Sequence, residues 1–212
     1  MKKLLVLAFI MAGTLTTFAQ QDGGNGDPNE IRTLMGHNNS VGGYGALTMQ
    51  YSQINNHDAF VFGARGGVLM GHMVSMGLSI NGFFNDKHYD PITGYTQHLA
   101  GGYGGFFFEP ILLPKYPVHV SFPVLIGGGG IGVVNNTDDS WDNYFNSEAS
   151  DAFMVIEPGI EVEMNITNFF RFCIGAHYRY TTDITIDNPD YAIEPDILRG
   201  FMGGVTFKFG RF

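Results

Sequence analysis

The sequence predicts an all-β fold: an eight-stranded antiparallel up-and-down transmembrane β-barrel over residues 40–212. Three observations lead to this prediction. Apolar and polar residues alternate along many stretches, which is typical of strands with one face in lipid and the other in a polar interior. Short turns alternate with longer polar connections along the chain. Charged residues make up only 15% of the sequence, too few to coat an ordinary soluble secreted domain.

The N-terminal residues are expected to be removed before folding. Two lysines precede the apolar run 4–12, which is too short to cross a bilayer as a helix, and small residues end at Ala19. This pattern predicts a secretory signal peptide over residues 1–19; the polar residues that follow disfavour the alternative of a membrane anchor. Residues 20–39 are polar and contain several glycines, and we expect them to form a flexible N-terminal segment.

Charge and cysteine content narrow the choice of partners. The formal net charge is -9, and an acidic chain is a poor ligand for nucleic acid because it repels phosphates. Cys173 is the only cysteine, so an exported chain of this kind has no internal disulfide to stabilise it.

The first four predicted strands span residues 47–52, 60–70, 74–84 and 99–112. The first alternates strictly between apolar and polar residues. In the second, Phe60 and Phe62 share one face and Arg65 lies on the other. The third places Leu78 on the face opposite Ser79, and the fourth is rich in glycine and phenylalanine.

The last four predicted strands span residues 118–126, 154–164, 170–180 and 201–209. Val118 and Val120 alternate with His119 in the first of these. In the next, apolar residues alternate with glutamates, and in the third they alternate with arginines and a histidine. The final strand sets Phe207 and Phe209 against Lys208 and can pair with the first strand, which leaves no open edge.

The connections differ in length. Residues 71–72, 114–117 and 166–168 are predicted short turns, whereas 53–58, 85–98, 135–151 and 182–197 are predicted to be longer polar loops. Short turns at one end and long loops at the other are the outer-membrane barrel plan, with the short turns in the periplasm. A soluble lipocalin-like barrel would have the reverse faces, with an apolar interior and a charged exterior.

If the apolar faces meet lipid, a set of ionisable residues must point into the lumen. The predicted set is Arg65, Glu109, Glu157, Glu161, Glu163, Arg171, His177, Arg179 and Lys208. An eight-stranded lumen is only wide enough for side chains to fill it. We therefore predict a plug of carboxylate–cation pairs. A proton or ion path along the same carboxylates is the alternative.

Other candidate chemistry is weak. Residues 127–132 contain a GxGxxG pattern, but no helix start follows, so a dinucleotide site is not predicted. We expect a smooth patch near the outer rim instead, or a crevice for a lipid tail. The histidines form no zinc-binding spacing, no metal or other cofactor is predicted, and nothing in the sequence brings Ser140, His88 and Asp138 together as a catalytic triad.

Two of the predicted loops are acidic. Their carboxylates are Asp138, Asp139, Asp142, Glu148 and Asp151 in one loop, and Asp183, Asp187, Asp190, Glu194 and Asp196 in the other. Neither loop has the spacing of a calcium-binding EF-hand. We expect a solvated rim; cation bridging to lipopolysaccharide and contact with a surface ligand are alternatives.

The C-terminal stretch 200–212 ends an alternating strand with Phe212, and it resembles the signal that barrel-assembly machinery reads. Residues 40–212 as a whole are similar to the OmpA-like and OmpX-like group of small outer-membrane barrels. The resemblance implies a bacterial outer-membrane location, with outer-membrane lipids and the assembly machinery as partners. Phe212 departs from the pattern because it has the parity of Lys208, which predicts a bulge or frayed end near Gly210.

Three functions are consistent with this sequence. The first is a monomeric structural or surface-interaction protein with a plugged lumen, which is not an enzyme. The second is a narrow ion or solute channel, and the third is a lipid-modifying barrel enzyme.

Overall fold

The computed structural model describes residues 41–54, 57–86, 88–89, 96–135, 150–186 and 194–212. The predicted signal peptide and the segment 20–39 lie outside the described residues. None of the described residues belongs to a helix long and apolar enough to span a bilayer. The regular elements are β1 (Val41–Ile54), β2 (His57–Met70), β3 (Val74–Asn85), β4 (His88–Tyr89), β5 (Thr96–Leu112), β6 (Val118–Ser121), β7 (Val124–Asn135), β8 (Ser150–Asn165), β9 (Phe170–Thr181) and β10 (Gly200–Arg211).

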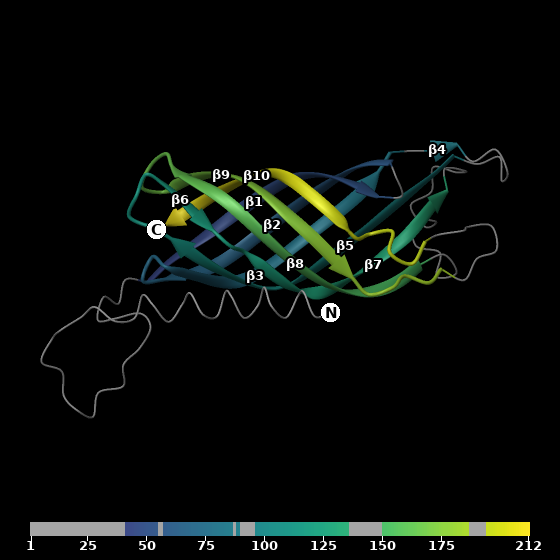
Figure 1. The fold of residues 1–212 in the computed structure, drawn as a ribbon, viewed down its shortest axis with the longest axis horizontal. Coiled ribbons are helices and arrows are strands. Elements are labelled where there is room, and N and C mark those ends of the chain that lie inside the picture. The colour runs from purple at the N-terminus through teal and green to yellow at the C-terminus, as the bar shows by residue number, and fades with distance from the viewer. Residues whose placement is uncertain (1–40, 55–56, 87, 90–95, 136–149, 187–193) are drawn as a thin grey trace, which may run out of the picture. The chain divides into compact units, whose positions relative to one another are not determined.

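These strands close into a ring (Figure 1). All pairings are antiparallel, and β1 pairs with both β2 and β10, so the first and last strands meet. β3 pairs with β5, and β8 with β9, which completes the circle. β4 is a two-residue strand that pairs with the start of β5.

β6 and β7 are two parts of one ring strand. The break falls at Pro123, which has no N–H to donate to a neighbouring strand. The register does not change across it: Ser121 lies opposite Glu161, and Val124, three residues later, lies opposite Pro158. The ring therefore has eight strands, in the order β1, β2, β3, β5, β6/β7, β8, β9, β10. The predicted all-β, eight-stranded antiparallel barrel is confirmed.

The two faces of each strand have opposite chemistry. Leu78 and Ile80 of β3 are 68% and 67% exposed on the outside, whereas Ser75 and Ser79 are buried inside. Large apolar side chains cover the outside of the other long strands as well, among them Met49, Phe62, Phe106, Ile126, Met154, Ile160, Ile174 and Phe201. This is the reverse of a soluble lipocalin-like barrel and suits contact with hydrocarbon.

The two ends of the barrel also differ. The short-turn end carries residues 71–73, 113–117 and 166–169, and the C-terminus lies there too (Figure 1). Gly71 and His72 both have φ near +60°, the conformation of a tight hairpin turn, and the Met73 N–H closes it on Met70 O. The opposite end is called the long-loop end below.

Two predicted loops are partly strand. Within the predicted loop 85–98, residues 88–89 pair with residues 96–97. Residues 53–58 were expected to be a longer polar connection, but Gln53 pairs with Asp58 and Ile54 with His57 inside the β1–β2 ladder. Only residues 55–56, outside the described residues, separate the two strands. The adjoining ends of β1 and β2 are largely polar. A strand end that projects from the membrane into water has polar residues, as a loop does, so sequence alone does not distinguish the two.

The predicted bulge near Gly210 is also wrong. β10 keeps one register with β1 from Met202, opposite Ser52, to Arg211, opposite Gly43. Phe212 keeps the inward parity of Lys208, and its ring lies 4.0 Å from the Arg171 guanidinium carbon. The final aromatic side chain therefore covers the lumen at the short-turn end, and no irregularity is needed.

The sequence predicts that the glycine run of β7 lies near the outer rim, but the run lies along the middle of the strand. Gly127 pairs with Gly105, and Gly130 pairs with Gly102, along the middle of the β5–β7 ladder. A Cβ on inward-facing Gly127 would lie 2.0 Å from Gly104 O, whereas a Cβ on outward-facing Gly130 has no neighbour closer than 3.6 Å. Close approach of the two backbones on the inner side explains why a side chain is absent at Gly127.

Candidate functional site in the barrel lumen

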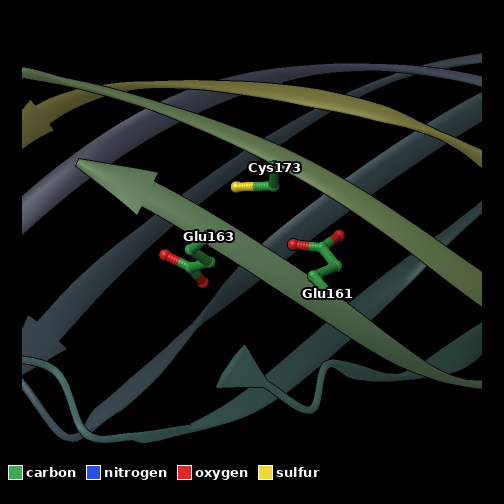
Figure 2. A group of neighbouring side chains, drawn as sticks. All are labelled: Glu161, Glu163 and Cys173. Atoms are coloured by element: carbon green, nitrogen blue, oxygen red, sulfur yellow. The ribbon is translucent and has the colours of Figure 1, made fainter. Parts of the chain in front are cut away.

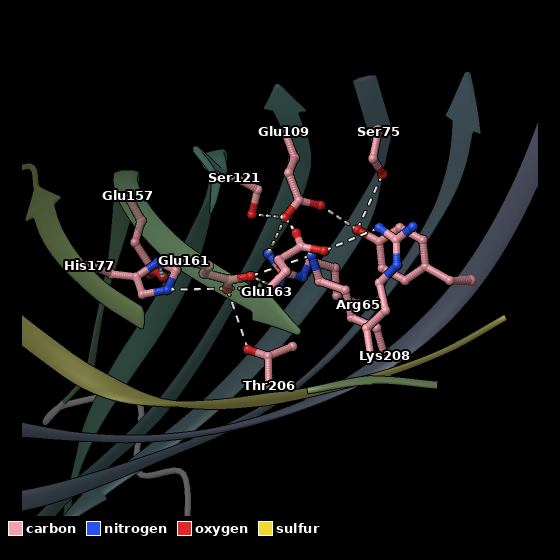
Figure 3. Close-up of polar contacts among 12 residues, drawn as sticks. Arg65, Ser75, Glu109, Ser121, Glu157, Glu161, Glu163, His177, Thr206 and Lys208 are labelled. Carbon is pink, nitrogen blue, oxygen red and sulfur yellow. Dashed lines mark hydrogen bonds and ion pairs between the residues drawn. The ribbon is translucent and has the colours of Figure 1, made fainter. Parts of the chain in front are cut away.

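The nine ionisable residues expected in the lumen are all buried in the structure, between 0% and 7% exposed. Most of them gather toward the short-turn end in a charged layer, and Figure 3 shows part of this layer around Lys208, Glu109 and Glu161. The charged layer consists of Arg65, Glu109, Glu157, Glu161, Glu163, Arg171, His177 and Lys208, with His119 in addition. Arg179 lies apart from it and is described below.

Lys208 is the central cation of the charged layer. Its Nζ lies 2.6 Å from Glu109 Oε1, 2.6 Å from Glu163 Oε1 and 3.4 Å from Glu161 Oε2. The three donors of a lysine ammonium can serve three carboxylates in this way. Lys208 is 1% exposed, so these contacts replace its hydration.

Arg65 supplies a second cation. Its NH2 donates to both oxygens of Glu161, at 2.8 and 3.1 Å, and its NH1 lies 4.0 Å from Glu109 Oε1. Arg65 is on β2 and Glu161 on β8, four strands apart in a ring of eight. The pair therefore crosses the full width of the lumen.

Neutral hydroxyls complete the coordination of Glu109. The Tyr44 hydroxyl donates to its Oε2 at 2.6 Å, and the Ser121 hydroxyl to its Oε1 at 2.9 Å. Ser75 donates in turn to the Tyr44 oxygen at 3.2 Å. With Lys208, this gives a fully buried carboxylate three close donors.

Glu163 lies nearest the short-turn end. Its Oε2 is 3.3 Å from Arg171 NH1 and 3.2 Å from His119 Nε2. His119 Nδ1 lies 3.2 Å from the carbonyl oxygen of Tyr116, in the β5–β6 turn. The charged layer thus reaches the backbone of that turn.

Glu157 lies on the other side of the layer. The Tyr103 hydroxyl donates to its Oε2 at 2.6 Å, and His177 Nδ1 lies 3.6 Å from its Oε1. The other ring nitrogen of His177 lies 3.4 Å from Glu161 Oε1. His177 therefore links Glu157 to the rest of the charged layer.

Several of these contacts involve residues outside the predicted set of ionisable lumen residues, namely Tyr44, Ser75, Tyr103, His119 and Ser121. Thr206 is another, since its hydroxyl donates to Glu161 Oε1 at 3.4 Å. Parity offered a signal for some of them. Tyr103 has the inward parity of Glu109 on the same strand, and His119 and Ser121 alternate with the outward valines of β6. Their partners lie on distant strands, and no spacing along the chain reveals them.

Arg179 has a different environment from the other cations. It is fully buried, and its Nε donates to the Leu198 carbonyl oxygen at 2.7 Å. Its guanidinium carbon lies 5.3 Å from the centre of the Phe83 ring and 5.7 Å from that of Tyr103. In the described part of the chain, its NH1 and NH2 have no hydrogen-bond partner.

An apolar layer surrounds Arg179 and fills the lumen at the long-loop end. Its members are Ile54, Val61, Phe83, Leu99, Phe153, Val155, Ile184, Ile197, Leu198 and Met202. Ile184, Ile197 and Leu198 come from residues 182–186 and 194–199, which we call the outer strap. The sequence had placed this strap in an exposed loop. Its burial could not be read from three apolar residues in a polar segment.

Side chains and backbone both hold the outer strap: the Ile184 N–H donates to the Pro195 carbonyl at 2.9 Å and the Thr182 N–H to the Met154 carbonyl at 3.1 Å. The Arg199 Nε donates to the Thr181 carbonyl at 2.9 Å, and the Arg199 guanidinium pairs with Asp183. The Asp151 carboxylate accepts the Thr185 N–H at 2.7 Å. Asp151 and Asp183, which were both expected on a solvated rim, therefore help to hold the strap. The remaining acids of those loops that fall within residues 136–149 and 187–193 lie outside the described residues.

One group of buried side chains has donor atoms close enough to hold a metal ion. It consists of Glu161, Glu163 and Cys173 (Figure 2). One donor atom of each lies within 4.8 Å of the others, and all three residues are buried. The Lys208 ammonium, however, already contacts both carboxylates, and Arg65 and Arg171 take further oxygens. A protein cation thus fills the place that a metal ion would need, and the group fits an ion-pair cluster better than a metal centre.

The other candidate chemistry receives no support from the described residues. Ser140 and Asp138 lie outside them, and so does the side chain of His88. The GxGxxG pattern lies within β7 and is followed by strand rather than helix, so the geometry of a dinucleotide site is missing.

No protein-family model matches the chain, and no curated protein matches its sequence. Solved structures do resemble it. Neisserial surface protein A has a TM-score of 0.56 at 9% identity, over 80% of this chain and 96% of that one. Ail of Yersinia pestis, in complex with the heparin analogue sucrose octasulfate, has a TM-score of 0.47 at 10% identity, over 81% and 98%. The N-terminal β-barrel domain of Pseudomonas aeruginosa OprF has a TM-score of 0.44 at 10% identity, over 80% and 96%. The chain has the fold of the small OmpA- and OmpX-like outer-membrane barrels.

Proposed function

We propose that this chain is a monomeric bacterial outer-membrane β-barrel with a closed lumen, which serves as a structural or surface-interaction protein. The proposal rests on two ion pairs that cross the lumen, Arg65–Glu161 and Lys208–Glu109. Each joins strands four positions apart in a ring of eight. Side chains that meet across the full width leave little room for a solute.

The membrane location is supported by the exterior. Exposed aromatic side chains lie toward both ends, including Tyr51, Tyr180 and Phe201 at the long-loop end and Tyr116, Phe169 and Phe209 at the short-turn end. Aromatic residues prefer the two interfaces of a bilayer, and aliphatic residues such as Ile80 lie between them. Cell fractionation should recover the protein with the outer membrane, and it should migrate differently on gels before and after boiling.

The charge balance supports a plug rather than a pathway. Among the described residues, the lumen holds four buried carboxylates and four fixed cations, and the apolar layer lies between the charged layer and the long-loop end. An ion crossing the barrel would have to break several buried ion pairs and then pass through that apolar layer, both at high cost.

Planar-bilayer recording tests the closed lumen. We expect no unitary conductance from the folded wild-type barrel, with fold verified by heat-modifiable gel migration. Reproducible conductance that changes in Glu157→Gln or Glu161→Gln would support the narrow channel instead. Altered lipid A masses in a deletion strain would support the lipid-modifying enzyme.

A further inference from the structure

Arg179 is the one cation of the lumen that has no carboxylate within 4.0 Å among the described residues. A buried guanidinium is costly when its N–H groups are not satisfied. Here only Nε has a hydrogen-bond acceptor, the Leu198 carbonyl oxygen, while NH1 and NH2 have none. The Tyr103 hydroxyl donates its own proton to Glu157, and its oxygen, which interacts with the Arg179 guanidinium, can accept from at most one of the two terminal nitrogens.

The absence of an Arg179–Glu157 ion pair is informative because the two residues face each other. β8 and β9 pair Ile156 with Tyr180 and Gly159 with His177, and this register places Glu157 across from Arg179, although the ladder pairing lapses at Glu157 and Pro158. Residues so placed have Cβ atoms about 5 Å apart, within easy reach for these long side chains. Instead, Glu157 turns to Tyr103 and His177, and Arg179 turns into the apolar layer.

We propose that the apolar layer and Arg179 form a binding site for a small amphipathic carboxylate of the medium-chain fatty-acid class. The NH1 and NH2 groups of an arginine present a planar fork that matches a carboxylate. The surrounding side chains, among them Phe83, Phe153 and Leu99, suit an alkyl chain. A dianionic phosphate fits this site less well. Arg179 carries a single positive charge, so it can balance a monoanionic carboxylate but not a dianion.

The outer strap occupies this site in the structure. Leu198 places a carbonyl oxygen on the Arg179 Nε, and the Leu198 side chain is fully buried in the apolar layer. A polar oxygen on the guanidinium and an apolar group in the layer are the two features that the ligand would supply. The ligand enters from the long-loop end as Ile197 and Leu198 move aside.

The test compares two probes of equal chain length, decanoate and 1-decanol, by calorimetry on the full barrel in nanodiscs, with empty nanodiscs subtracted. Decanoate should bind saturably and decanol should only partition. In Arg179→Lys, which keeps the charge but loses the fork, decanoate should bind at least about tenfold more weakly. Lys115→Gln, which removes a cation from the exposed β5–β6 turn at the short-turn end, is the control and should retain binding.

The proposal is overturned if decanoate and decanol behave alike, or if folded Arg179→Lys binds decanoate as well as the wild type does. The comparison of the two probes on the wild-type barrel needs no variant, so a folding defect in Arg179→Lys does not remove the test. A barrel that binds decanoate without conducting leaves the proposed closed lumen standing, so the two proposals fail separately.

Discussion

Lys208 on β10 and Glu109 on β5 meet across the barrel, with Nζ and Oε1 2.6 Å apart. Their strands lie opposite each other in the ring, and so do those of Arg65 and Glu161. The lumen is therefore held by bonds that span it, in addition to those between adjacent strands. Since each cation also serves a second carboxylate, the charged layer is expected to respond to mutation as a unit.

Lys208→Met should be strongly destabilising. The substitution keeps most of the side-chain volume but leaves Glu109, Glu161 and Glu163 without their shared cation. Removing one partner from a buried ion pair typically costs about 3–5 kcal/mol. The free energy of unfolding in urea, followed by heat-modifiable gel migration, measures this. Lys115→Met, in the exposed β5–β6 turn, is the control and should change stability by less than about 0.5 kcal/mol.

The Arg65–Glu161 pair should show coupling in a double-mutant cycle. Arg65→Met and Glu161→Leu each strand an opposite charge, whereas the double variant removes both charges at once. We expect the double variant to be more stable than the sum of the single effects predicts, by about 1–3 kcal/mol. Additive losses in urea unfolding would show that the two residues act independently.

Much of the fold followed from parity in the sequence. Alternation located all eight ring strands and assigned Arg65 and Glu161 to the inner face, because a charge facing lipid is penalised at each position separately. Which inward residues touch was not predictable. Contacts such as Tyr44–Glu109 depend on the stagger of strands around the ring, and the alternation within one strand carries no record of it.

Arg179 shows the same limit most clearly. Its inward parity predicted burial among the other lumen charges, but its partner is a backbone carbonyl of the outer strap. Every residue has a backbone carbonyl, so the residue type does not reveal which one accepts a hydrogen bond from Arg179. Residues 182–197 are predicted as a polar loop because acids and prolines separate Ile184 from the adjacent residues Ile197 and Leu198.

Two glycines of β7 offer a matched test of the backbone packing. Gly127→Ala should destabilise the barrel by about 1–3 kcal/mol, because its new Cβ would lie 2.0 Å from Gly104 O and the strands must separate. Gly130→Ala faces outward with room for a methyl group and should change stability by less than about 0.5 kcal/mol. Urea unfolding of both variants in the same lipid measures the difference, and equal effects would contradict the close-approach explanation.

The outer surface can be tested with a charge at a mid-strand position. Ile80 is 67% exposed and lies opposite Ala64 and Gly104, away from both strand ends. If this surface lies in hydrocarbon, Ile80→Arg should cost about 2–4 kcal/mol in a bilayer, because the guanidinium loses its hydration. Gln53→Arg, at the exposed outer end of β1, should cost little, since water reaches it there. Unfolding free energies measured in phospholipid vesicles would distinguish the two positions. A cost-free Ile80→Arg would place the surface in water and remove the physical basis for the outward apolar face.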